Sequence, residues 1–223
     1  MNKLYKLNNI LILSSIVVFI IALVVVIRKT NIDKVGEIDK NSITEIDSIK
    51  SKENDSLKII NDSLNNVTIS KLKSLFNVSK DEFDPNGLTW YKPKNASKYV
   101  NENSIYCYFQ FDNNKASNFR FRLQYLNDDW LFIQKVQFSI DGKPFEFIPN
   151  DVQSDNDTEI WEWFDENIDV FNEPLIEAIA NAKSVKIKLI GRQYFDTKTM
   201  TKSQINSIKN TLDLYRAMGG TFN

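Results

Sequence analysis

The sequence predicts an α+β protein in three parts: an N-terminal transmembrane helix, a helical stalk, and a mostly antiparallel β head with two helices. Three observations predict this organisation. An uncharged apolar run occupies residues 10–27, a segment with heptad spacing follows over residues 31–80, and short runs over residues 81–223 alternate apolar and polar side chains. We expect the head to be a sandwich or a curled sheet.

Composition excludes several kinds of functional site. The 223-residue chain has no His and one Cys, so it lacks the commonest general base and an intramolecular disulfide or cysteine zinc cluster is impossible. Lys and Arg total 28 against 29 Asp and Glu, and residues 81–223 hold 16 of these bases and 21 of the acids. This acidic balance argues against a nucleic-acid-binding head. No catalytic residue, cofactor or metal site is predicted.

The apolar run over residues 10–27 is the predicted membrane anchor, in a helix at residues 10–28 behind a tail of residues 1–9. It holds no charge, Gly or Pro. About 18 residues at ~1.5 Å each span roughly 27 Å, close to the hydrocarbon thickness of a bilayer. A cleaved signal peptide has a shorter apolar core and a small-residue cleavage site, which this run lacks. The lipid bilayer is therefore the first expected partner.

The charges beside the apolar run leave its orientation open. Two lysines precede the run and four basic residues follow it closely, which favours a cytoplasmic head. A short tail before an apolar run is, however, also typical of an uncleaved signal that exports the chain behind it. We expect a single-pass protein of the bacterial inner membrane with an extracytoplasmic head.

Residues 31–80 are predicted to form a helical, coiled-coil stalk or linker. A motif of Asp, Ser and an aliphatic residue begins at Asp47, Asp55 and Asp62, with steps close to two helical turns. A heptad register over residues 43–67 is mostly apolar at its core positions, which favours a homo-oligomer. The alternative is a solvated spacer, because Ser, Asn and Asp are poor helix formers.

The head begins after a turn signal at residues 84–87, and its strands follow from alternation. The clearest strand is 118–126, and the inward pattern of strand 130–140 changes at Gln134, which predicts a bulge. Asp141-Gly142 predicts a tight hairpin, and residues 150–157 a polar loop. The expected strands are 88–91, 105–111, 118–126, 130–140, 145–148, 159–164, 185–190 and 193–195.

Two head helices have recognisable ends. Asn172 is the expected N-cap of the first, which has Pro174 in its first turn and runs to about Ala182. A capping box at residues 201–204 begins the second, and Gly219 ends it.

The acidic residues around Trp161 and Trp163 have two interpretations. Stacking Trp rings with paired carboxylates would suit a glycan-processing site. Strand alternation instead places both Trp side chains on one face and Glu162 on the other, which favours core Trp residues and solvated acids. Residues 155–159 have the alternate acids of a calcium loop without its Gly, so a polar turn is favoured there. Cys107 falls on an inward face and is expected to be inert core.

Basic side chains on the predicted strands are the candidate partner-binding residues. Together they would form a stripe for anionic groups, and the alternative is an ordinary solvated sheet face. The candidates are Arg120, Arg122, Lys186, Lys188 and Arg192.

Three runs resemble a known group of proteins: IWEWFD at residues 160–165, AIANAKS at 178–184 and GRQYFD at 191–196. Together with the capped helix that follows them in the sequence, these runs make residues 80–220 similar to an uncharacterised domain found in bacterial surface, lipoprotein-like and phage-associated proteins. The stalk motif resembles coiled spacers in Bacteroidetes envelope proteins. This resemblance carries no catalytic residue to the chain.

These observations together predict a membrane-tethered, non-enzymatic interaction module of the bacterial cell envelope, whose partner is an envelope protein or a glycan. One alternative is a glycan-binding or glycan-processing envelope protein. Another is an exclusion or immunity factor carried by a phage or plasmid.

Overall fold

The structure is a computed structural model that describes residues 58, 66–84, 87–112 and 114–223. The predicted membrane helix at residues 10–28 and most of the predicted stalk lie outside the described residues. Within the described ranges, no helix has the length and apolar character needed to cross a bilayer.

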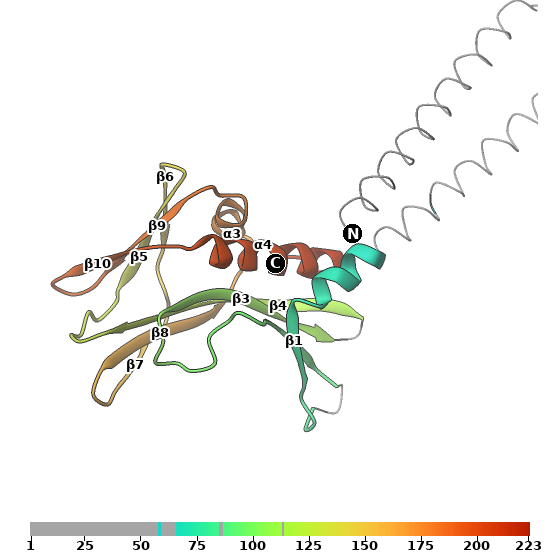
Figure 1. Cartoon of the computed structure of the whole chain (residues 1–223), viewed down its shortest axis with the longest axis horizontal. Helices are drawn as coiled ribbons and strands as arrows, with labels where there is room; N and C mark the ends of the chain where they lie inside the picture. Colours follow the sequence, from blue (N-terminus) through green and yellow to red (C-terminus); the bar gives the residue numbers. More distant parts are fainter. Residues whose placement is uncertain (1–57, 59–65, 85–86, 113) are drawn as a thin grey trace, which may run out of the picture. The chain divides into compact units, whose positions relative to one another are not determined.

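In the described part of the chain, ten strands form two antiparallel sheets (Figure 1). The six-stranded sheet, here sheet A, has the order β1-β2-β3-β4-β8-β7, and the four-stranded sheet B has the order β10-β9-β5-β6. Sheet A consists of β1 Phe76–Lys80, β2 Thr89–Pro93, β3 Ser104–Asp112, β4 Lys115–Asn127, β7 Gln153–Asn156 and β8 Ile160–Asn167. Sheet B consists of β5 Lys135–Ile140, β6 Lys143–Phe147, β9 Val185–Ile190 and β10 Phe195–Thr199. The α+β prediction is confirmed for this part of the chain.

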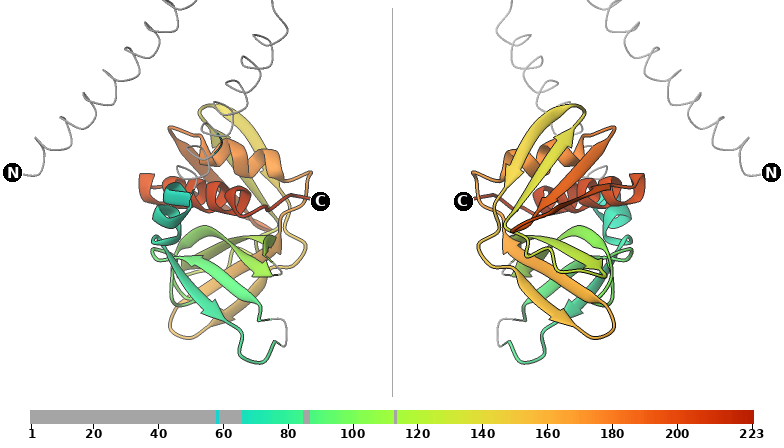
Figure 2. Two further views of the ribbon diagram at one scale, coloured as in Figure 1. Left: turned by 90° about the vertical axis from the view of Figure 1, so that its right-hand side faces the viewer. Right: turned by 90° about the vertical axis from the view of Figure 1, so that its left-hand side faces the viewer.

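Two helices lie on the same side of sheet A as sheet B (Figure 2). Helix α4, Lys202–Ala217, packs on β3 and β4, and helix α3, Glu173–Ala180, packs on α4. The capping box predicted for α4 is present, and Gly219 follows its end at φ +81°. Residues 66–73 are also helical. Sheet B and α4 thus share the inner face of sheet A between them.

The core between these layers comes from the alternation read in the sequence. The side chains of Cys107, Phe109 and Phe121 are fully buried on the inner face of sheet A. Phe121 contacts Phe138 of sheet B at 6.4 Å between ring centroids, while Phe109 meets Tyr215 of α4 at 5.5 Å. Burial raises the pKa of the Cys107 thiol well above its ordinary value, in keeping with the predicted inert core position.

The head begins earlier in the chain than the sequence indicated. Residues 76–80, predicted as the end of the stalk, form β1 and pair with β2. The turn signal at residues 84–87 therefore closes a hairpin inside sheet A, where the hydrogen bond from Gly87 N–H to the Asp84 carbonyl measures 2.9 Å. Phe76 is buried against Tyr91 and Phe109, so this hairpin contributes to the core.

Five further predictions need correction. Residues 130–134 are not part of a strand, and residues 153–156 of the predicted loop form β7. The final strand is 195–199, not 193–195, and α3 ends at Ala180. Asn172 occupies the N-cap position of α3, but its side chain makes no capping hydrogen bond. Asp169 Oδ1 instead accepts the backbone N–H groups of Phe171 and Asn172, just before the helix.

Candidate binding surface

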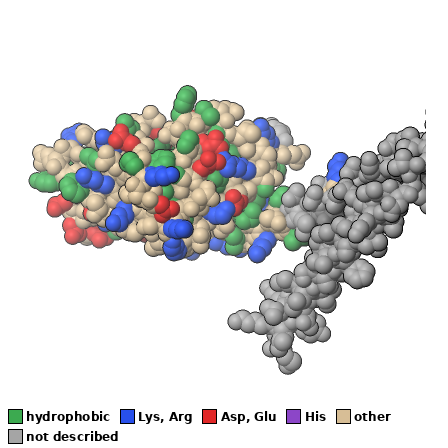
Figure 3. All heavy atoms as spheres, turned by 90° about the horizontal axis from the view of Figure 1, so that it is seen from above, with side chains coloured by type: hydrophobic (Ala, Val, Ile, Leu, Met, Phe, Trp, Pro, Cys, Tyr) green, Lys and Arg blue, Asp and Glu red, His purple; other side chains and the backbone are tan. Residues whose placement is uncertain are grey.

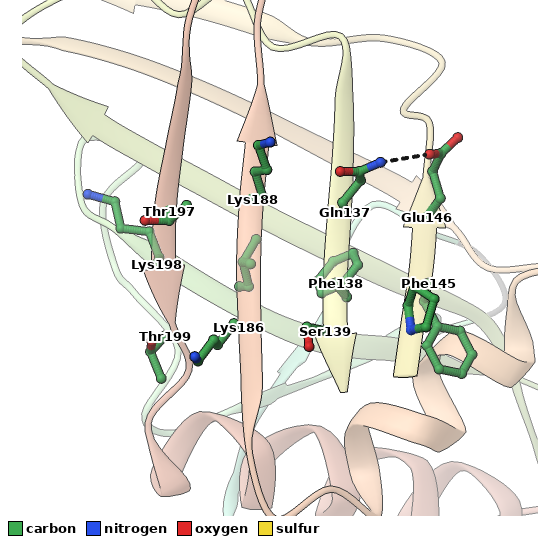
Figure 4. A pocket seen from close by; sticks show the side chains of 12 residues that line it. Gln137, Phe138, Ser139, Phe145, Glu146, Lys186, Lys188, Thr197, Lys198 and Thr199 are labelled. Atoms are coloured by element: carbon green, nitrogen blue, oxygen red, sulfur yellow. Dashed lines mark hydrogen bonds between the residues drawn. The ribbon is translucent and has the colours of Figure 1, made fainter. Parts of the chain in front are cut away.

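The outer face of sheet B brings Lys186 and Lys188 together. Both lie on β9, where Val185, Ile187 and Leu189 alternate with them and point into the core. The register places Lys188 between Gln137 and Thr197, and Lys186 between Ser139 and Thr199. Figure 4 shows these side chains on three neighbouring strands, β5, β9 and β10, with Glu146 on β6 beside them. We call this surface the lysine face; its central residues are Gln137, Ser139, Lys186, Lys188, Thr197 and Thr199.

The lysine face is hollowed into a groove of about 760 Å³. Three lysines and one acid line it: Lys186, Lys188, Lys198 and Glu146. Glu146 is held by Lys135 at 3.2 Å and by the Gln137 amide at 3.3 Å, contacts that lower the pKa of its carboxyl. Within the described part of the chain, Lys186 Nζ forms no ion pair. The groove therefore presents an excess of positive charge and several neutral hydrogen-bonding groups.

Aromatic side chains border this face at the end of β9. The Phe195 side chain is 61% exposed, and Lys188 Nζ lies 4.1 Å from its ring centroid, a cation–π distance. In the space-filling view, basic, acidic and hydrophobic side chains are interspersed over the head (Figure 3).

A second aromatic feature, here the aromatic stack, consists of Trp130, Phe132 and Arg192. The Trp130 and Phe132 rings are parallel within 15°, with centroids 5.6 Å apart, and the Arg192 guanidinium lies 5.0 Å from the Phe132 centroid. Phe132 remains 45% exposed. Phe132 lies three residues before β5 and Arg192 two residues after β9, so the stack is next to that end of sheet B.

The backbone at Phe132 is strained. Its φ of +54° is a left-handed conformation that a bulky L residue rarely adopts. The buried Glu162 side chain stabilises it: Glu162 Oε1 accepts the N–H groups of Leu131 and Phe132 at 2.7 and 2.8 Å, and Oε2 accepts that of Ile133 at 2.8 Å. Successive N–H groups that converge on one anion where right- and left-handed backbone conformations alternate are known as a nest. Residues 131–133 form a nest around the Glu162 carboxylate.

The position of Arg192 is fixed by close backbone approach. The Arg192 N–H donates to the Leu131 carbonyl at 3.2 Å. A Cβ atom on Gly191 would lie 1.9 Å from that same oxygen, so only Gly fits between the two loops. The aromatic stack is therefore held rigidly from both sides.

The structure separates the other two candidate residues from this surface. Arg120 and Arg122 lie on the outer face of sheet A, where both pair with Asp165 at 2.7 and 2.9 Å. Tyr108 also donates to Asp165 at 2.6 Å, and its pKa is raised, first by burial and then by that hydrogen bond. The predicted stripe is thus two clusters, one on each sheet.

The expected faces of β8 are reversed. Glu162 is only 2% exposed, whereas Trp161 and Trp163 are half-buried on the outer face of sheet A. The neighbouring acids are also engaged, because Asp165 is held by two arginines and Glu166 accepts from the Asn150 side chain at 2.6 Å. Glu162 and Asp165 lie on opposite faces, so they do not form a pair for acid–base chemistry.

Sequence reasoning did not identify the aromatic residues of this surface, Trp130, Phe132 and Phe195. The Gly191-Arg192 pair was the available signal, because a Gly just after a strand marks a close approach as readily as a turn. Comparison of the chain with protein families, curated proteins and solved structures finds no match.

Proposed function

We propose that this protein is a membrane-tethered, non-enzymatic interaction module of the bacterial cell envelope, whose head binds its partner through the lysine face. One observation carries the binding part of the proposal: a groove of about 760 Å³ that presents Lys186 and Lys188 on the exposed face of a four-stranded sheet. Sites on strands hold side chains in place better than sites on loops, which suits recognition.

A non-enzymatic role is supported by the state of the acids next to Trp161 and Trp163. A glycan-processing site would need two carboxylates facing one bond. The Glu162 carboxylate instead accepts hydrogen bonds from three backbone N–H groups. Asp165 forms ion pairs with Arg120 and Arg122. These acids have structural partners in place of a substrate.

The tether is supported by the apolar run over residues 10–27, which has the length of a bilayer core. Anchoring would confine the head to a layer near the membrane and raise its effective concentration toward an envelope partner. We place the anchor in the inner membrane and the head outside the cytoplasm.

Fractionation of bacterial cells tests the tether. The full chain is expected in the membrane pellet after carbonate and high-salt extraction, and a chain of residues 31–223 in the supernatant. Protease added to spheroplasts is expected to digest the head of the full chain while a cytoplasmic marker stays intact. A processed product of the full chain that appears in the carbonate supernatant and begins beyond Lys29 would refute the tether.

Site-directed photo-cross-linking tests the lysine face. A photoreactive residue at Thr197, in the face, is expected to yield a saturable adduct that the double variant Lys186→Gln, Lys188→Gln reduces. The same residue at Ser79, on the outer side of sheet A, serves as the control and should yield none. Adducts of equal yield at both positions would contradict binding through the lysine face.

A further inference from the structure

We propose that the lysine face binds an acidic polysaccharide, whose carboxylates meet Lys186 and Lys188 and whose sugar rings pack on Phe195. This inference rests on the function proposed above and names its ligand class.

Charge favours an anionic ligand at this place on the molecule. Residues 66–223, the head as the structure describes it, carry 19 bases and 21 acids, so the head as a whole has a small negative net charge. The groove reverses that sign locally through Lys186 and Lys188, because Glu146 already pairs with Lys135, and Lys198 with Asp196 at 3.1 Å. An anion near the head is therefore attracted to this face in preference to the rest of the surface.

The spacing of the charges favours a polymer. Lys186 and Lys188 are two residues apart on one strand, which separates their attachment points by roughly 7 Å. A ligand with charges repeated along its length meets both lysines in one binding event, whereas a single small anion meets one at a time.

The neutral lining favours a sugar over other polyanions. Gln137, Ser139, Thr197 and Thr199 supply groups that both donate and accept hydrogen bonds, which matches the hydroxyls of a saccharide. Phe195 presents an exposed aromatic ring beside Lys188, and the exposed Phe132 ring lies close to the same end of the sheet. The apolar face of a sugar ring packs on such rings as other apolar groups do.

Other partners fit this surface less well. A peptide added as an extra strand would pair with the backbone at an edge of the sheet, β10 or β6. The lysine face is instead formed by side chains above the sheet, and its two lysines lie on β9, which is paired on both sides. Insertion into a membrane would need a broad apolar patch, whereas eight of the twelve residues that line this groove are polar or charged. Vesicle binding is a separate outcome of the test.

Binding is measured with the full chain in micelles of a polyoxyethylene detergent, which has no sugar head group. The probes are polygalacturonate, alginate and hyaluronan as acidic polymers, dextran as a neutral one, and vesicles with and without phosphatidylglycerol. We expect retention by at least one acidic polymer, weakened by salt, with no retention by dextran.

Matched variants locate the site. The double variant Lys186→Gln, Lys188→Gln is expected to lose about tenfold in affinity, since two exposed ion pairs are removed. Phe195→Ala should lose about fivefold through the lost ring contact. The controls are Lys94→Gln with Lys98→Gln, and Phe171→Ala, which remove exposed groups of the same kind elsewhere on the head and should leave affinity unchanged. Near-UV circular dichroism confirms that each variant is folded.

Three outcomes would overturn the inference. One is the absence of binding to all three acidic polymers, and another is equal loss in the control lysine variant, which would mean unspecific attraction. The third is binding of phosphatidylglycerol vesicles that depends on Lys186 and Lys188 while the polymers do not bind. If a protein adduct at Thr197 persists in any of these cases, the proposed function stands and only its ligand class fails. A chain found free of the membrane would instead refute the tether and leave the polymer result intact.

Discussion

Glu162 joins the two sheets through the segment that crosses between them. Its carboxylate accepts three consecutive backbone N–H groups at 2.7–2.8 Å in a buried place, which makes each bond charge-assisted. A buried carboxylate with fewer partners would be costly, so this residue and the loop at residues 131–133 depend on each other.

Glu162→Gln is therefore expected to destabilise the head by about 2–3 kcal/mol, because the amide group turns a donor toward one of the three N–H groups and leaves it unpaired. Chemical denaturation of the variant measures this loss. The control is Glu159→Gln, which changes an exposed carboxylate directly before β8. It should cost less than about 0.5 kcal/mol. Equal stability of the two variants would show that the nest is dispensable.

The left-handed backbone at Phe132 allows a comparison of two truncations. Replacing an Ala by Gly ordinarily destabilises a protein, since Gly has more freedom in the unfolded chain. At φ +54° the order should invert, because Gly adopts this conformation without the cost of about 1 kcal/mol that an L residue incurs. Phe132→Gly is thus expected to be more stable than Phe132→Ala by about 0.5–1 kcal/mol in thermal or chemical unfolding.

Phe195 provides the control for that comparison. It is an exposed aromatic residue on β10 and does not have a positive φ. Phe195→Gly should be less stable than Phe195→Ala, the ordinary order. If both positions rank the two variants alike, the strain assigned to Phe132 is absent in solution.

At the scale of elements, Asp141 ties the β5–β6 hairpin to the start of β9. Its carboxylate accepts the backbone N–H of Lys183 at 3.0 Å and that of Ser184 at 2.8 Å. These two bonds hold the pKa of the Asp141 carboxyl below its ordinary value of 3.8. The lowered pKa means that the folded state favours the ionised form.

Because the folded pKa lies below the unfolded one, the stabilisation from Asp141 is present above about pH 4 and is lost as pH falls through the folded pKa. Asp141→Asn, which tolerates the same turn backbone, should lower the unfolding midpoint at neutral pH and approach the parent protein at acid pH. Parallel melts of both proteins across this range measure the difference. A constant difference at every pH would contradict the assignment.

Strands with one buried face were predictable from the sequence, while the two edge strands of sheet A were not. The run 118–126 alternates because Phe119, Phe121 and Leu123 meet the core, and β4 appears where that pattern is. In β7 every residue is exposed, and in β1 only Phe76 is buried, so neither has a period of two to detect. Such strands are specified by pairing with a neighbour, which lies elsewhere in the sequence.

The reversed faces of β8 have a different physical cause. Residue preference places Trp inside and Glu outside, and alternation then assigns the whole strand. Three N–H groups from residues 131–133 outweigh that preference by satisfying Glu162 in the interior. Residues 131–133 resemble part of a strand in the sequence, because Leu131 and Ile133 are apolar, and both are buried. Their N–H groups, however, bond to the Glu162 carboxylate and not to a neighbouring strand.

At the scale of the whole molecule, assignment of strands to sheets decides which candidates can act together. Arg120 and Lys186 both point outward from their strands, as alternation predicted. They belong to different sheets, so one contributes to an ion-pair cluster with Asp165 and the other to the lysine face. Sequence spacing contains no information on this division, because strand order depends on contacts between distant segments.

Where the head begins is a further property of the whole molecule. The described residues from 66 onward form one compact unit, in which Ile69 and Leu72 pack against the core before β1 starts. The ring centroids of Phe76 and Tyr91 lie 6.5 Å apart. The Lys94 N–H donates to the Leu75 carbonyl at 3.0 Å. The segment that the sequence assigned to the stalk thus contributes contacts to the fold.

A chain of residues 61–223 is therefore expected to unfold in a single cooperative transition, and one of residues 81–223 to be much less stable. The shorter chain loses the Phe76 side chain, a change worth about 3–5 kcal/mol for a buried ring, and exposes the edge of β2 to association with other chains. That loss is a large part of the roughly 5–15 kcal/mol that stabilises an ordinary domain. Denaturant titration and light scattering of both chains measure it. Equal midpoints, with no association of the shorter chain, would place the start of the head after β1.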